Sequence, residues 1–242
     1  MDNSIQIGMK YFEEGLKSLE INLTEIQKEQ FIRYYDILIE WNKIMNLTAI
    51  TDFVEVVQKH FIDSLTIVKA MSIDNKKIID IGTGAGFPGI PLKIAFPSTQ
   101  IVLLDSLNKR INFLNEVIEI LDLKDIETIH GRAEDYGKTS QYREQFDLCV
   151  SRAVANLSSL SEYCIPFVKT GGCFISYKSG KAIEEMDAAQ NAIKLLGGKV
   201  LNTTEFSLPN TDMQRTLITI GKIITTPKKY PRSAGKPSKE PL

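Results

Sequence analysis

Between Lys76 and Lys222 the sequence alternates between short apolar runs and amphipathic stretches, and this alternation restricts the possible fold more than any other feature. The apolar runs are rich in β-branched residues and have the length of buried strands. Strands that alternate with helices indicate a parallel sheet covered on both faces. The predicted strands are KKIIDI (76–81), QIVLLD (100–105), IETIH (126–130), FDLCVSR (146–152) and GCFISYK (172–178), with helices predicted at 88–96, 108–121, 133–137, 156–168 and 181–196.

The end of this region departs from the alternation. Two further strands are predicted at 198–208 and 214–222, and only a turn around Pro209–Asn210 separates them. Such a pair forms a hairpin, so one of its strands must run antiparallel to its neighbours. The fold class is therefore α/β, with a Rossmann-like parallel sheet that carries a C-terminal antiparallel hairpin.

The N-terminal residues have a helical pattern. Thr24 is a predicted N-cap with Gln27 in the capping-box position, and apolar and aromatic residues then recur at three- and four-residue spacing up to Trp41. We interpret these aromatic residues as core. The predicted organisation is a helical region at 1–72, a sheet unit at 73–224 and an extended tail at 225–242, within a chain of 242 residues.

The stretch IIDIGTGAGFPG (78–89) follows the first strand of the sheet and contains four glycines in its last eight positions. Ligands of parallel α/β sheets bind at the carboxyl ends of the strands, and glycines there let the backbone approach them. A dinucleotide-binding G-x-G-x-x-G pattern fails from Gly82, because Phe87 stands at its third position. The pattern fits from Gly84 through Gly86, but the strand would then end two residues too early.

The other interpretation is a site for S-adenosylmethionine (SAM). It uses Asp80, Gly82 and Gly84 after the first strand, and Asp105 at the end of the second strand to accept the two ribose hydroxyls. An acidic residue at this second position serves a nicotinamide dinucleotide equally well. The C-terminal hairpin favours a class I SAM-dependent methyltransferase sheet, because the doubly wound dinucleotide fold lacks it.

Two later segments fit the same interpretation. GRAEDY (131–136) follows the third strand, where a backbone amide at Ala133–Glu134 can contact adenine, although Glu134 is equally explained as an acid in the first turn of a helix. SRAVANL (151–157) follows the fourth strand, where the reacting group of the substrate lies in such enzymes. Arg152 there points into the cleft or forms a surface ion pair.

An ordered set of motifs gives a specific resemblance. WNKIMNLTAI, HFIDSL, DIGTGAGFPGIPL, DSLNKRINFL, GRAE, SRAVA and YPRSAGKPSKEPL run nearly from end to end of the chain. With them the chain resembles the ribosomal RNA small subunit methyltransferase G family, also called glucose-inhibited division protein B. The resemblance implies SAM-dependent methylation of guanine N7 at position 527 of 16S ribosomal RNA, with SAM contacts at Gly82, Phe87, Ala133, Glu134 and Arg152. Ser179 and Ser233 depart from the expected pattern.

The chemistry of this reaction fits the residues present. Guanine N7 has an exposed lone pair, so no base is needed, and alignment of the reactants can carry catalysis. Arg152 is accordingly expected to position substrate or cofactor, and its guanidinium matches the N7/O6 edge of guanine. His60 either touches RNA or packs the N-terminal helices onto the sheet, with packing favoured, and His130 is interpreted as structural. No His, Cys, Asp or Glu cluster has metal-ligand spacing, and the three cysteines are interpreted as core residues.

Charge indicates where RNA is bound. The chain has a formal net charge of −1, yet from Lys222 onward it carries six basic residues against one acidic residue. Such a segment either binds phosphates or is a solvated end. The predicted RNA contacts are Lys109, Arg110, Lys228, Lys229, Arg232 and Lys236.

The absence of a long apolar run and of a signal-like N-terminus predicts a cytoplasmic enzyme that does not enter the membrane. A monomer is expected, with 16S RNA or the small ribosomal subunit as partner. Two alternatives stay open at this point. One is a SAM-dependent methyltransferase for another RNA or a small molecule, and the other is a non-catalytic module that binds SAM or a nucleotide.

Overall fold

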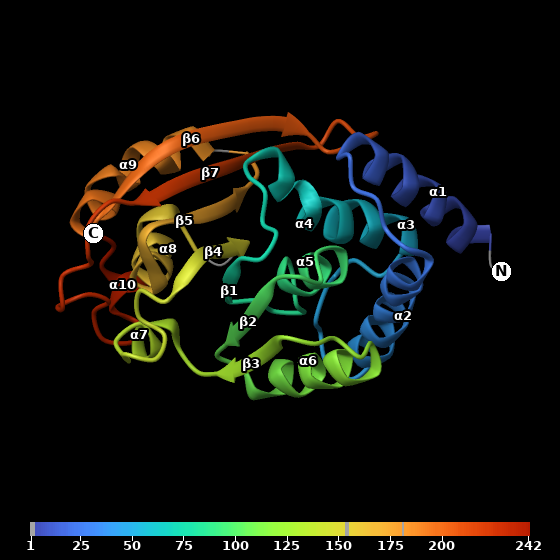
Figure 1. Cartoon of the computed structure of the whole chain (residues 1–242), viewed down its shortest axis with the longest axis horizontal. Coiled ribbons are helices and arrows are strands. Elements are labelled where there is room, and N and C mark those ends of the chain that lie inside the picture. Colours follow the sequence, from blue (N-terminus) through green and yellow to red (C-terminus); the bar gives the residue numbers. More distant parts are fainter. Residues whose placement is uncertain (1–2, 153–154, 181) are drawn as a thin grey trace.

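The structure is a computed structural model that describes residues 3–152, 155–180 and 182–242. Its centre is one mixed sheet in the order β3-β2-β1-β4-β5-β7-β6 (Figure 1). The first five strands are parallel, and β7 is antiparallel to both β5 and β6, so the expected sheet with its C-terminal hairpin is confirmed. The strands are β1 (Lys77–Ile81), β2 (Gln100–Asp105), β3 (Ile126–His130), β4 (Phe146–Arg152), β5 (Val168–Lys178), β6 (Gly198–Ser207) and β7 (Gln214–Lys222).

Within the sheet unit, one boundary differs from the expectation by more than one residue. A helix was predicted to continue to residue 168 and a strand to start at 172, but β5 already begins at Val168. Val168 pairs with Phe146, and Gly171 adopts a φ of +87° that lets the strand continue through a bulge. The predicted helix is correspondingly shorter, with α8 at Leu157–Cys164 and the 3₁₀ turn η3 at Ile165–Phe167.

Helices cover both faces of the sheet. Ile78 and Ile79 are adjacent on β1 but belong to different apolar clusters, as the two-residue period of a strand requires. The Ile78 cluster includes the N-terminal helices, α5 and α6, whereas the Ile79 cluster includes α8, η3 and α9. The helices of the sheet unit not yet given are α5 (Gly89–Ala95), α6 (Asn108–Ile120), α7 (Ala133–Tyr136) and α9 (Ala182–Leu195).

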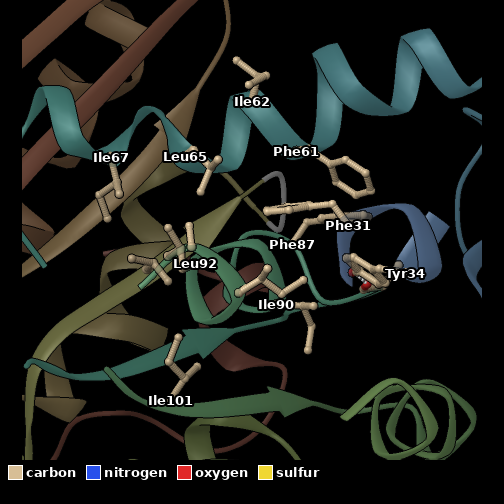
Figure 2. Packing of buried hydrophobic residues seen from close by; sticks show 14 of the residues in the cluster. Phe31, Tyr34, Phe61, Ile62, Leu65, Ile67, Phe87, Ile90, Leu92 and Ile101 are labelled. Carbon is tan, nitrogen blue, oxygen red and sulfur yellow. Dashed lines mark hydrogen bonds between the residues drawn. The ribbon is translucent and has the colours of Figure 1, made fainter. Parts of the chain in front are cut away.

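The N-terminal helices pack directly behind the loop that follows β1. Thr24 and Gln27 form the predicted capping box. Figure 2 shows Phe61 and Tyr34 from two different helices packed close to Phe87 of the loop. The 1–72 region therefore shares a core with the sheet. Its elements are α1 (Asn3–Ser18), α2 (Glu25–Asn42), α3 (Phe53–Val56), the π-helical turn η1 (Val57–Ile62), α4 (Asp63–Leu65) and the 3₁₀ turn η2 (Thr66–Lys69).

The C-terminal tail is not the extended segment that its composition predicted. It folds back onto α8, buries Tyr230 and Pro237, and contains the short helix α10 (Lys236–Lys239). The Arg143 guanidinium donates to the carbonyls of Thr226 and Tyr230 at 2.6 and 2.8 Å. Buried apolar surface and satisfied carbonyls together explain why this proline- and lysine-rich segment is ordered.

Candidate active site

The loop after β1 forms one wall of a cavity of about 510 Å³ at the carboxyl ends of the parallel strands. Gly84 has a φ of +62°, and a Cβ added there would find no atom nearer than a carbonyl oxygen at 4.0 Å. Side chains are absent here because the left-handed backbone favours glycine and because the space belongs to the cavity. Its volume lies in the range of small-molecule sites. Of the predicted SAM contacts, the structure places Gly82, Gly84, Phe87, Asp105, Ala133, Glu134 and Arg152 on its wall.

Asp80 and Gly86, also predicted to contact SAM, lie behind the loop and not on the cavity wall. The Asp80 carboxylate is fully buried and accepts from the Thr83 hydroxyl at 2.7 Å and from the Gly89 N–H at 2.9 Å. Burial raises the pKa of Asp80 to about 7. A Cβ on Gly86 would collide with Ile90 and with the Tyr34 hydroxyl. Both residues therefore shape the loop. Asp80 connects its two ends through hydrogen bonds, and Gly86 leaves space for core side chains to pack against it.

Asp105 connects the loop to the end of β2. Its Oδ2 accepts the Gly84 N–H at 2.9 Å, its Oδ1 accepts the Leu107 N–H at 2.9 Å, and Arg110 pairs with it at 3.2 Å. Oδ1 thus keeps a lone pair that can accept a hydrogen bond from a hydroxyl group in the cavity. Arg110, predicted to bind RNA, is instead engaged with Asp105 on the cavity wall.

Glu134 connects the cavity to the tail. Its Oε1 accepts the backbone N–H of Gly235 at 2.8 Å, and the residue is 4% exposed. Tyr163 of α8 also lines the cavity, and its neighbour Glu162 pairs with Arg232 of the tail. The folded tail therefore stands directly behind the side of the cavity where adenine was expected.

Comparison with known proteins identifies the family. The family model described as rRNA small subunit methyltransferase G matches residues 27–218. The chain belongs to this family. It is 58% identical to the ribosomal RNA small subunit methyltransferase G of Lachnoclostridium phytofermentans, over 96% of each chain. It is 54% identical to the protein of the same description from Acetivibrio thermocellus, over 95% of this chain and 94% of that one.

Solved structures are similar in fold. The YcgJ protein from Bacillus subtilis has a TM-score of 0.52 at 11% identity, over 67% of this chain and 98% of that one. The [4+2]-cyclase SpnF has a TM-score of 0.54 at 12% identity, over 67% and 81% of the two chains. A cyclase with this sheet illustrates that the fold alone does not name a reaction. Family membership does, and it confirms the predicted 16S ribosomal RNA methyltransferase, its action on guanine N7 and its use of SAM.

In this methyltransferase G family member, several contacts hold Arg152 on the wall of the cavity. Its NH1 donates to the Lys59 carbonyl and to Asp63 Oδ2, both at 3.1 Å, and its NH2 lies 3.2 Å from His60 Nδ1. The guanidinium carbon also lies 5.2 Å from the centre of the Phe87 ring. Arg152 is thus a fixed positive charge in the cleft and not part of a surface ion pair. Ala153 and Val154 of the SRAVANL segment lie outside the described residues.

His60, for which the sequence favoured packing over RNA contact, lines the cavity. Its ring stacks on Phe87 with centroids 4.5 Å apart, and its Nε2 lies 2.9 Å from the Thr48 hydroxyl. Burial, together with the nearby charge of Arg152, lowers the pKa of His60 to about 3, so the ring is neutral. It does pack N-terminal helices against the loop, but it also faces the cavity. In the sequence, the position of His60 within the HFIDSL motif was the feature that could have indicated a role at the site.

The remaining predicted RNA contacts fall into two groups. Lys109, Lys228, Lys229 and Lys236 are exposed. Arg232 instead donates to both oxygens of Glu162, which is completely buried, and its backbone N–H donates to the same carboxylate. The structure therefore places Arg232 in the folding of the tail.

Within the described ranges, no group of three or more His, Cys, Asp or Glu side chains is arranged to hold a metal ion. Every helix in the same ranges is too short or too polar to cross a membrane. Cys149 and Cys164 are buried, Cys173 is half-buried, and all three are free thiols.

Proposed function

We propose that the 510 Å³ cavity binds SAM and that the chain transfers its methyl group to N7 of guanine 527 in 16S ribosomal RNA. The observation that carries this proposal is the Gly84–Asp105 hydrogen bond beside the empty space in front of Gly84. This hydrogen bond fixes the glycine backbone at position 84 next to the Asp105 carboxylate, which keeps a free lone pair. Both groups lie at the strand ends, where this fold binds ligands. Glu134 and Ala133 close the adenine side.

The bound SAM would supply a methyl group on a positively charged sulfur. The residues of the chain then have to align this methyl with guanine N7 and to exclude water. N7 loses no proton when it attacks, so no general base is required. His60 is neutral and engaged with Thr48, and Arg152 is a donor only, which suits positioning and not proton removal.

RNA is held by exposed lysines in this proposal. Lys228, Lys229 and Lys236 lie on the tail that packs against α8, and Lys109 lies at the start of α6, next to Arg110 of the cavity wall. These side chains can contact phosphates around the cavity, which would release counterions and make RNA binding dependent on salt.

We also propose that the chain acts as a cytoplasmic monomer and that 73–224 is the methyltransferase unit, with 1–72 and 225–242 packed upon it. Light scattering on the purified protein tests the monomer directly.

The experiment for the function itself uses labelled SAM, purified full-length protein, and either small ribosomal subunits or deproteinised 16S RNA. Label in the RNA supports the proposal, whereas label confined to small molecules supports a different substrate. SAM binding without transfer to either RNA form would indicate a non-catalytic module.

A further inference from the structure

A second cavity, of about 660 Å³, adjoins the first at Arg152 and His60, since both residues line both cavities. It is built from the ends of β4 and β5, the start of α9, and residues of η1 and α4. Tyr177 and Ile50 contribute apolar surface, and Asp63, Lys178, Glu185 and Arg215 contribute charge. A group that enters this cavity therefore comes into contact with Arg152 next to the proposed SAM site.

Most charged groups of this cavity already have partners. Asp63 accepts from Arg152 at one oxygen and from the Arg215 Nε at the other, both at 3.1 Å. Lys178 donates to the Ala155 carbonyl at 2.9 Å and to Glu185 Oε2 at 2.7 Å. These pairs form a rigid, polar wall.

Glu185 differs from the others because only one of its oxygens is used. Oε2 accepts both the Lys178 ammonium and the Leu157 N–H, the latter at 3.0 Å. Oε1 accepts no hydrogen bond from any residue that the structure describes. The side chain is 32% exposed and lines the cavity. The carboxylate is thus oriented by two donors while its second oxygen stays available.

The reaction restricts how guanine can enter. Enzymes that act on a base inside structured RNA take it out of the stack and read its Watson–Crick edge. If N7 must face the SAM cavity, the N1–H and the 2-amino group point away from it. Both are donors, and a carboxylate is an acceptor.

We infer that the 660 Å³ cavity receives the extruded guanine and that Glu185 accepts hydrogen bonds from its N1–H and 2-amino group, which makes Glu185 the residue that selects guanine. The inference rests on the proposed function. Adenine also has an N7, but it presents the N1 lone pair to the carboxylate and lacks the 2-amino group. Glu185 would therefore reject adenine, while Lys178 keeps the carboxylate in place.

The test compares small subunits reconstituted with 16S RNA that carries guanine or inosine at position 527. Inosine keeps N7 and N1–H but lacks the 2-amino group. We expect wild-type kcat/KM for guanine to exceed that for inosine by about tenfold or more, the scale of one hydrogen bond to a charged group. In Glu185→Gln the ratio should fall towards one. Glu184→Gln, an exposed neighbour on α9 with the same change of charge, should keep the wild-type ratio.

A binding measurement supplements the rates. Subunits with 7-deazaguanosine at position 527 lack the nucleophile but keep the Watson–Crick edge, so they should inhibit the wild type competitively and Glu185→Gln about tenfold less well. SAM affinity measured by calorimetry should be equal in the three proteins, which shows that the variants are folded.

The outcomes separate the two proposals. If the wild type leaves guanine 527 unmethylated, the proposed function fails, and this inference fails with it. If guanine 527 is methylated but inosine reacts equally fast with the wild type, the assignment of Glu185 alone is overturned. An unchanged guanine-to-inosine ratio in folded Glu185→Gln also overturns it.

Discussion

Two features favour glycine at position 84, its left-handed φ and the open cavity beside it, and substitutions can distinguish their effects. Gly84→Val should lower SAM affinity at least tenfold, because a β-branched side chain would resist a φ of +62° and enter the cavity. Calorimetry on the folded variant measures this loss. The matched control is Gly171→Val, which has a φ of +87° and equally open space but lies outside the cavity. Equal losses in both variants would show that strain, and not occupation of the site, is responsible.

His60 makes the stability of the protein dependent on pH. Its pKa of about 3 in the folded state lies below the ordinary value of 6.5, so the unfolded chain binds the proton first. The stabilisation is complete above pH 6.5 and is lost as pH falls from there towards 3. Between pH 7 and pH 5 the wild type should lose about 2 kcal/mol more than His60→Gln.

Urea unfolding at the two pH values measures this difference, and the exposed His130→Gln is the control. Asp80 acts in the opposite direction, because its raised pKa makes the folded state bind a proton more readily as pH falls from 7. The comparison must therefore be made between wild type and variant. An identical loss in wild type and His60→Gln would contradict a buried neutral imidazole.

Single residues also show which parts of the candidate site can be predicted from the sequence. Asp105 and Glu134 were predicted to lie at the site because motif position determines which strand end they occupy. Asp80 and Gly86 come from the same motif but face inward, because a tight loop must bury some of its residues. The orientation of His60 depends on the packing of η1 against Phe87, a contact between distant segments that no local pattern encodes.

At the scale of elements, the strands were predictable and the tail was not. β2, β3, β4 and β7 have the predicted bounds because a short run of apolar, β-branched residues is a local signal in the sequence. The tail has the composition of a disordered segment, and its order depends on Arg143 and Glu162, which lie far away in sequence. The tail reaches these partners only once α8 and the loop before β4 are folded onto the sheet.

Arg232 should be a determinant of stability. Arg232→Met removes the partner of a completely buried carboxylate, so the free energy of unfolding should fall by about 3 kcal/mol. Urea denaturation measures the change. Lys229→Met, an exposed position three residues earlier, should change it by less than about 0.5 kcal/mol. If Arg232→Met is as stable as Lys229→Met, the tail is not anchored through this ion pair.

The exposed lysines of the tail should govern RNA affinity without affecting SAM. In Lys228→Gln/Lys229→Gln, RNA affinity should fall and its dependence on salt should become shallower by nearly two charges, because fewer counterions are released. Filter binding across a salt series measures both quantities. The substitutions are preferable to truncation after Thr226, since truncation would also remove the Gly235 contact to Glu134 and weaken SAM binding. A full salt slope in the double variant would place the RNA elsewhere.

At the scale of the whole molecule, three segments of the chain meet at one cleft. The N-terminal region supplies His60 and Thr48, the sheet supplies the glycine loop and Asp105, and the tail contacts Glu134 from behind. Figure 1 shows the N-terminal helices and the C-terminal segment at opposite sides of the sheet. The regions outside 73–224 therefore contribute to the candidate site. The sequence pattern had indicated only that they differ from the sheet unit in composition and in predicted structure.

We expect the protein to methylate N7 of a single guanine in 16S ribosomal RNA. The most direct measurement incubates small subunits with SAM, with and without the full-length protein, and maps N7-methylguanine by borohydride reduction and aniline cleavage. Cleavage at guanine 527, present only when both protein and SAM are supplied, is the predicted result. Methylation at another nucleotide or another atom, or no cleavage at position 527 with folded protein that binds SAM, would contradict the account.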